Sequence, residues 1–158
     1  RNAIRAHIHH ATEEKEYPIW GLSPCAITEG LRGGYEEFGV SDIGSKGYKD
    51  GGVVTPHVTF LALPFEPAEA IKNIRAFLKL FPIYGPYGFY DSVDVTKGKV
   101  CYQYLALDQG MTLIALDNYL NNNAISARFH ADLAGSRVEP LLAAEEFYPG
   151  FNSSSEPK

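Results

Sequence analysis

Two long segments rich in glycine, proline and aromatic residues restrict what this chain can fold into. They span residues 20–53 and 82–104, and neither shows the sustained apolar periodicity of a long helix or strand. Loops of this length inside a compact domain are usually either functional or disordered. Because Trp20, Tyr35 and Tyr48 are spaced along the first segment, we disfavour disorder there and interpret it as functional.

The remaining sequence predicts helices. A helix over residues 2–15 is expected to stop before Pro18, because a residue that precedes proline leaves the helical conformation. Thr55-Pro56 and Glu66-Pro67 each place proline at a first helical position. Further helices are expected over residues 105–120, 124–130 and 137–147, with short strand pieces only near Val53 and Val93. The predicted class is mainly α, with long aromatic loops.

Composition and charge exclude several partners. The chain has 158 residues, a formal net charge of -5 and a pI near 5.5, without a block of Lys or Arg. Nucleic acids and anionic membranes require a concentrated basic patch, so neither is an expected partner. No apolar run reaches the roughly 18 residues of a membrane helix. The chain begins at Arg1 and its single methionine is Met111, so we expect a piece of a longer translation product.

Three motifs suggest chemistry on carbohydrates. In the first, Trp20 and Tyr35 share a glycine-rich segment with three carboxylates, Glu29, Glu36 and Glu37. Cleavage of a glycosidic bond requires a protonated acid and a second carboxylate, and flat aromatic rings pack against the apolar faces of sugars. The alternative is that these glutamates are solvated loop charges.

The second motif is the aromatic run that contains Tyr87, Tyr90 and Asp91. A carboxylate among aromatic rings can have its pKa raised by desolvation, or can accept hydrogen bonds from sugar hydroxyls. The alternative is that Asp91 caps a turn or a helix.

The third motif places Asp108 and Gln109 at the start of an apolar helix, where they can bind sugar hydroxyls or simply complement the helix dipole. His57 is a further candidate for a hydrogen bond to a sugar, and His130 is expected to be structural. The histidines within residues 7–10 have no ligand partner at a suitable spacing, so we expect no metal site and no cofactor. Cys25 and Cys101 either pair in a disulfide or remain free.

Taken in order, the motifs resemble the C-terminal region of the glucoamylase-like family. The resemblance covers roughly residues 18–147 and is carried by Trp20-Gly21-Leu22-Ser23, Gly34-Tyr35, Gly52-Val53-Val54-Thr55-Pro56-His57, Leu63-Pro64-Phe65, Tyr87-Gly88-Phe89-Tyr90-Asp91 and Asp108-Gln109-Gly110-Met111. That family includes endo-β-1,2-glucanases, and a related domain occurs in cyclic β-1,2-glucan synthases. The sequence Pro24-Cys25-Ala26 departs from the family pattern, in which an aspartate usually follows the first motif.

The resemblance implies an (α/α)6 barrel of twelve helices, of which this chain can supply only five or six. Residues 1–148 would form a C-terminal part of such a barrel, and residues 149–158 would be a polar tail. The general acid is then expected outside this chain. The partner would be the missing N-terminal half of the barrel or a second copy.

These observations predict a glycoside-hydrolase-type domain that cleaves or transglycosylates a β-linked glucan, with β-1,2-glucan as a candidate. Asp91 and Glu37 are the expected catalytic carboxylates. The expected substrate-binding residues are Trp20, Tyr35, His57, Tyr87, Tyr90, Asp108 and Gln109. The resemblance implies a secreted or periplasmic setting. A non-catalytic carbohydrate-binding module and a structural helical domain remain alternatives.

Overall fold

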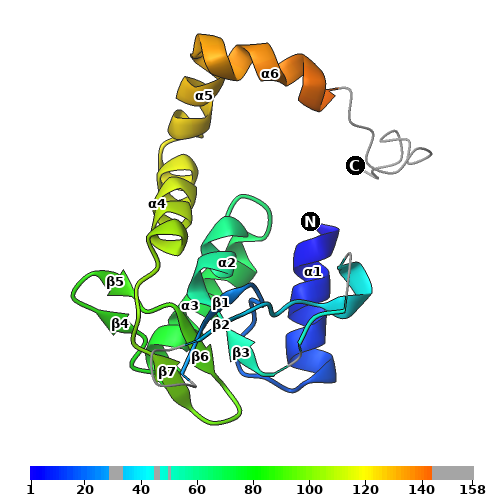
Figure 1. Cartoon of the computed structure of the whole chain (residues 1–158), viewed down its shortest axis with the longest axis vertical. Helices are drawn as coiled ribbons and strands as arrows, with labels where there is room; N and C mark the ends of the chain where they lie inside the picture. Colours follow the sequence, from blue (N-terminus) through cyan, green and yellow to red (C-terminus); the bar gives the residue numbers. More distant parts are fainter. Residues whose placement is uncertain (29–33, 45–46, 50, 144–158) are drawn as a thin grey trace.

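The computed structural model describes residues 1–28, 34–44, 47–49 and 51–143; Glu29 and the tail at 149–158 therefore lie outside the described residues. Figure 1 shows a compact body, formed by the N-terminal and central elements, and a helical arm that leads away from it. The body contains α1 (Asn2–His9), α2 (Pro56–Leu61) and α3 (Pro67–Leu80), and the arm consists of α4 (Ala106–Leu120), α5 (Ala124–Ala131) and α6 (Leu133–Ala143).

The helices of the body begin and end largely where the sequence predicts. α1 continues into a π-helical turn over His10–Glu14, which together match the helix expected over residues 2–15. Pro56 and Pro67 each occupy the start of their helix, where the missing N–H of proline costs no hydrogen bond. α3 ends at Leu80, just before Pro82.

The two aromatic segments hold more strand than expected. The first contains β1 (Cys25–Ile27), β2 (Gly34–Glu36) and β3 (Val53–Val54); the second contains β4 (Tyr84–Gly85), β5 (Gly88–Phe89), β6 (Ser92–Asp94) and β7 (Lys99–Cys101). All pairings between these strands are antiparallel: β1 with β2, β4 with β5, and β6 between β3 and β7. The short pieces expected near Val53 and Val93 are confirmed, and the five other strands of the described residues, each two or three residues long, were not predicted.

A buried polar residue ties the body together. Asn73, on α3, accepts a hydrogen bond from the Trp20 backbone N–H at 3.1 Å and donates one to the Trp20 carbonyl at 2.7 Å. Its amide also donates to the Thr59 hydroxyl on α2 at 2.7 Å. Asn73 therefore fixes the start of the first aromatic segment against both helices.

The arm is attached through α4, which packs against α2. Asn122 and Asn123 adopt left-handed backbone conformations between α4 and α5. The Asn118 side-chain oxygen accepts hydrogen bonds from the backbone N–H groups of Ile125 and Ser126 at 3.0 and 3.1 Å. These contacts fix the connection between the two helices, and Figure 1 shows that the chain changes direction most sharply after α5.

The outer helices of the arm are poorly covered. Within the described chain, α5 buries none of its side chains, and many apolar residues of α4–α6 are exposed. α6 begins at Leu133 rather than at the predicted residue 137, and it includes Pro140. The described chain thus has six α-helices, but these do not close into a barrel. Among the described residues, no helix is both long and apolar enough to cross a membrane.

Candidate active site

Two buried aspartates that are distant in sequence meet where the strands contact the arm. Asp91 directly precedes β6, and Asp108 lies in the first turn of α4. Each of the two residues is at most 5% exposed. We refer to Asp91 and Asp108 as the carboxyl pair.

The backbone on both sides holds Asp91 in place. The Ala26 N–H, on β1, donates to Asp91 Oδ2 at 2.7 Å, and the Asp91 N–H donates to the Gln103 carbonyl at 2.9 Å. The bond to Ala26 spans 65 residues, so Asp91 joins separate segments rather than capping a local turn. The alternative of a turn or helix cap is therefore wrong.

The environment of Asp91 favours its protonated form. Burial, followed by the hydrogen bond of its protonated form with Asp108, raises the pKa of Asp91 to about 7; the Ala26 N–H partly opposes this shift. Asp91 Oδ1 and Asp108 Oδ2 are buried and have no hydrogen-bond partner among the described residues. Two ionised carboxylates cannot hydrogen-bond to each other, because both have only acceptor oxygens. If one of them carries a proton, its O–H can donate to the other. The pair can therefore hold a proton at neutral pH.

His57, on α2, is the third buried member of the cluster. Its Nδ1 lies 3.4 Å from Asp108 Oδ2, and its Nε2 lies 3.2 Å from the Ser23 hydroxyl. Burial lowers the pKa of His57, although the charge of Asp108 opposes this effect. A neutral imidazole is thus favoured next to the carboxyl pair.

Tyr35 and Glu37 form the solvent-facing side of this region. Tyr35, on β2, is 56% exposed and pairs with Ala26 across the β1–β2 ladder. Desolvation, and then the charges of Asp108, Asp91 and Glu37, raise the pKa of Tyr35. The charges of the carboxyl pair and of the exposed Glu37 therefore both act on the phenol of Tyr35.

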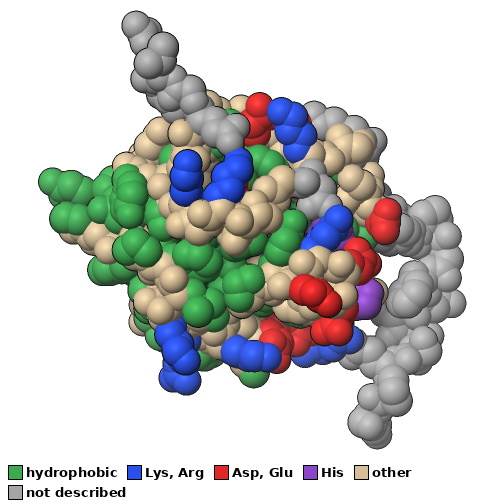
Figure 2. All heavy atoms as spheres, turned by 90° about the horizontal axis from the view of Figure 1, so that it is seen from below, with side chains coloured by type: hydrophobic (Ala, Val, Ile, Leu, Met, Phe, Trp, Pro, Cys, Tyr) green, Lys and Arg blue, Asp and Glu red, His purple; other side chains and the backbone are tan. Residues whose placement is uncertain are grey.

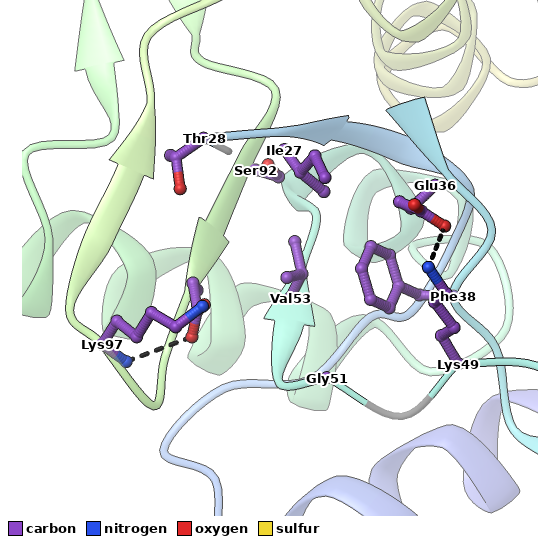
Figure 3. A pocket seen from close by; sticks show the side chains of 10 residues that line it. Ile27, Thr28, Glu36, Phe38, Lys49, Gly51, Val53, Ser92 and Lys97 are labelled. Carbon is purple, nitrogen blue, oxygen red and sulfur yellow. Dashed lines mark hydrogen bonds and ion pairs between the residues drawn. The ribbon is translucent and has the colours of Figure 1, made fainter. Parts of the chain in front are cut away.

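A hollow of about 200 Å³ is lined by residues of β1, β3 and β6 (Figure 3). Its walls include Phe38 and two ion pairs, Lys49 to Glu36 at 2.7 Å and Lys97 to Asp94 at 3.1 Å. It is lined by Ser92, which follows Asp91, but Asp91 itself does not line it. The hollow is thus a neighbour of the carboxyl pair and not its cavity.

Two residues that were predicted to bind substrate make structural contacts instead. Trp20 is only 3% exposed and packs in the apolar core with Phe60 and Leu63, so the prediction of a ring available for sugar stacking is wrong. Gln109 is half-buried, and its Nε2 donates to the Phe89 carbonyl at 2.8 Å. The side chain of Gln109 therefore joins α4 to the β4–β5 hairpin.

Tyr87 and Tyr90 belong to a larger aromatic group that the sequence motif did not reveal. Their rings contact Tyr104, and the ring of Tyr90 also contacts Tyr102. The only sequence signal for the two additional tyrosines was their spacing of two residues in a segment of aromatic composition.

The described residues contain no group of three or more His, Cys, Asp or Glu side chains arranged to hold a metal ion. Cys25 and Cys101 are both buried free thiols. Of the two alternatives, the structure has the free form.

Comparisons with known proteins identify related chains. Residues 1–132 match the Glycoamylase family model, described as "Putative glucoamylase". The cyclic β-(1,2)-glucan synthase NdvB of Rhizobium meliloti is 33% identical over 135 residues, covering 78% of this chain and 5% of NdvB.

Solved structures agree on the fold. An endo-β-1,2-glucanase from Chitinophaga pinensis, in complex with sophorotriose and glucose, matches 77% of this chain and 28% of its own, with 23% identity and a TM-score of 0.57. A β-1,2-glucanase from Parabacteroides distasonis matches 84% of this chain and 18% of its own, with 20% identity and a TM-score of 0.64. This chain spans less than a third of each of these relatives. The family match over most of its length shows that the chain belongs to the glucoamylase-like family.

Proposed function

We propose that this chain is part of a glycoside-hydrolase-type domain that binds and cleaves, or transglycosylates, a β-linked glucan, with β-1,2-glucan as the first candidate. Membership of the glucoamylase-like family supports this reaction class. The linkage is suggested by the names of two relatives, a cyclic β-(1,2)-glucan synthase and an endo-β-1,2-glucanase. In this proposal residues 1–148 contribute to a larger (α/α)6 barrel, in a secreted or periplasmic setting.

The observation that carries the proposal is the buried carboxyl pair, in which burial and Asp108 raise the pKa of Asp91. Glycosidases need a carboxylic acid that keeps its proton near neutral pH and a second carboxylate that stays ionised. The pKa of about 7 for Asp91 meets the first requirement within this chain, so we propose Asp91 as the acid in place of one outside the chain, where the resemblance had put it. Glu37, exposed next to Tyr35, is the candidate for the second.

The geometry assigns different roles to exposed and buried residues. Because Asp91 is only 2% exposed, a sugar reaches it only after the segments around it move aside. Tyr35 is accessible and is proposed to contact the substrate first. His57 and Asp108 then control the protonation of Asp91, and they bind sugar hydroxyls once the cluster opens.

A glucan assay on the polypeptide that carries this sequence tests the proposal. We expect release or transfer of glucosyl units from β-1,2-glucan, and a loss of at least about 100-fold in kcat for Asp91→Asn, as for removal of an acid–base catalyst. The control is Asp117→Asn, on the same helix as Asp108 but about 13 Å further along it. Absence of activity on β-1,2-, β-1,3- and β-1,4-glucans would refute the enzymatic proposal.

A non-catalytic binding module is the second candidate, favoured by the burial of the carboxyl pair. It predicts saturable glucan binding in calorimetry without turnover, and Asp91→Asn would then leave the affinity unchanged. Because Trp20 is a core residue, Trp20→Ala would report on folding and is unsuitable for this comparison.

A further inference from the structure

Four tyrosine rings form a continuous row on the surface next to the carboxyl pair. The ring of Tyr87 lies 5.6 Å from that of Tyr104, Tyr104 lies 4.8 Å from Tyr90, and Tyr90 lies 4.9 Å from Tyr102, measured between ring centroids. The outer contacts are edge-to-face, at 84° and 83°, and the central contact is tilted at 32°. We call these four residues the tyrosine row.

The tyrosine row is exposed at its ends. Tyr87 is 80% exposed and Tyr102 is 63% exposed. In Figure 2, hydrophobic side chains gather on the side of the molecule that carries the β4–β5 hairpin. Exposed aromatic rings in contact with one another are typical of a binding surface.

The row is nevertheless held rigidly. The Tyr104 hydroxyl accepts a hydrogen bond from the Tyr87 backbone N–H at 3.5 Å, and it is hydrogen-bonded to the Tyr90 hydroxyl, which raises the pKa of Tyr90. A side chain at Gly85 would collide with both of these hydroxyl groups. Rings that are fixed in advance lose little conformational entropy when a ligand binds.

Backbone contacts connect the tyrosine row to the carboxyl pair. Tyr90 directly precedes Asp91, and the Asp91 N–H donates to the carbonyl of Gln103, which lies between Tyr102 and Tyr104. Gln109, the residue after Asp108, donates to the Phe89 carbonyl, one residue before Tyr90. Hydrogen bonds of adjacent residues therefore join the tyrosine row to the segment that carries Asp91.

The chemistry of the row favours a saccharide over a protein helix. Each of its four side chains combines a flat apolar face with a hydroxyl, which suits a pyranose ring with its apolar face and equatorial hydroxyl groups. The arm differs, because its exposed residues are mostly aliphatic, such as Leu107, Leu113 and Leu120. Aliphatic surface of that kind suits a protein partner.

We propose that the tyrosine row is a saccharide subsite, in which Tyr102 and Tyr104 extend the surface begun by Tyr87 and Tyr90 and guide a glucan chain toward Asp91. The identity of the ligand as a glucan rests on the proposed function. The location of the subsite rests on the ring geometry alone.

Calorimetric titration of the chain with a linear β-1,2-linked gluco-oligosaccharide tests the subsite. We expect Tyr102→Ala and Tyr87→Ala each to weaken binding by about 5- to 10-fold, the range for loss of one aromatic contact. Tyr102→Phe retains the ring and should recover most of the affinity. The matched control is Tyr119→Ala, an exposed tyrosine at the far end of α4, which should bind like the unaltered chain.

The outcomes separate this inference from the proposed function. If the oligosaccharide binds but Tyr87→Ala and Tyr102→Ala retain full affinity, the subsite is refuted and the proposed function stands. If the unaltered chain binds none of the β-1,2-, β-1,3- and β-1,4-linked oligosaccharides, both fail. If instead these substitutions alter only the molecular mass in solution, the row is a protein interface and the subsite is refuted.

Discussion

Replacing Asp91 by Asn converts this side chain into a permanently uncharged analogue of its protonated form. The amide oxygen of Asn can accept the Ala26 N–H, and its NH2 group can donate to Asp108. The substitution therefore preserves both contacts while removing the titration. Any pH-dependent difference in stability between the two proteins then reports on Asp91.

The size of that difference follows from the pKa values. The ordinary pKa of an aspartate is 3.8, and that of Asp91 in the folded chain is about 7. Between these values the folded chain holds a proton that the unfolded chain releases, so stability from this group is complete below pH 3.8 and is lost as the pH rises to 7. At about 1.4 kcal/mol per pH unit, the loss reaches about 4 kcal/mol as an upper limit.

Urea unfolding of both proteins between pH 4 and pH 8 measures this effect. We expect the stability of Asp91→Asn relative to the unaltered chain to increase with pH, by about 2–4 kcal/mol in total, and to level off above pH 7. Asp94→Asn is the control with the opposite sign. Although burial alone would raise the pKa of Asp94, hydrogen bonds from Thr96 and Lys97 lower it overall, so its substitution should cost most at neutral pH and least in acid. A constant difference between Asp91→Asn and the unaltered chain would refute the protonated carboxyl pair.

Three further predictions concern the body and the arm. Asn73→Ala should lower the free energy of unfolding by about 3 kcal/mol, because it leaves buried backbone groups of the first aromatic segment unpaired; Lys72→Ala, on the exposed face of the same helix, should change it by less than about 0.5 kcal/mol. Burial raises the pKa of both Cys25 and Cys101, so a thiol reagent should modify neither in the folded protein and both in denaturant, and fast labelling under native conditions would contradict this. The exposed aliphatic surface of the arm should cause self-association in analytical ultracentrifugation, which Leu120→Lys should weaken; a monomer at all concentrations would contradict it.

The sequence predicted helices well wherever proline marked their boundaries. Pro56 and Pro67 identified the starts of α2 and α3 correctly, whereas the start of α6, which has no such marker, was misplaced by four residues. The strands of two or three residues escaped prediction because alternation needs a longer run to be recognised. Their existence depends on partners far along the chain, such as the pairing of Val54 with Val93.

The sequence identified residues of the candidate site but not the contacts between them. The motifs singled out Asp91, Asp108 and His57, and the structure brings all three into one buried cluster. The bond from Ala26 to Asp91 has no local signal, since it joins residues on separate segments. For the same reason the burial of Trp20 could not be foreseen, because it depends on Asn73 and the helices that pack around the indole.

The connection between α4 and α5 has a consequence for how this chain can meet a neighbouring surface. It is held by two left-handed asparagines and by two hydrogen bonds that the Asn118 side-chain oxygen accepts, and the described α5 buries none of its side chains. Breaking those few bonds would let α5 and α6 swing as a unit while β1, β6 and Asp91 stay in register. The outer helices can therefore adjust to a neighbouring surface without disturbing the carboxyl pair.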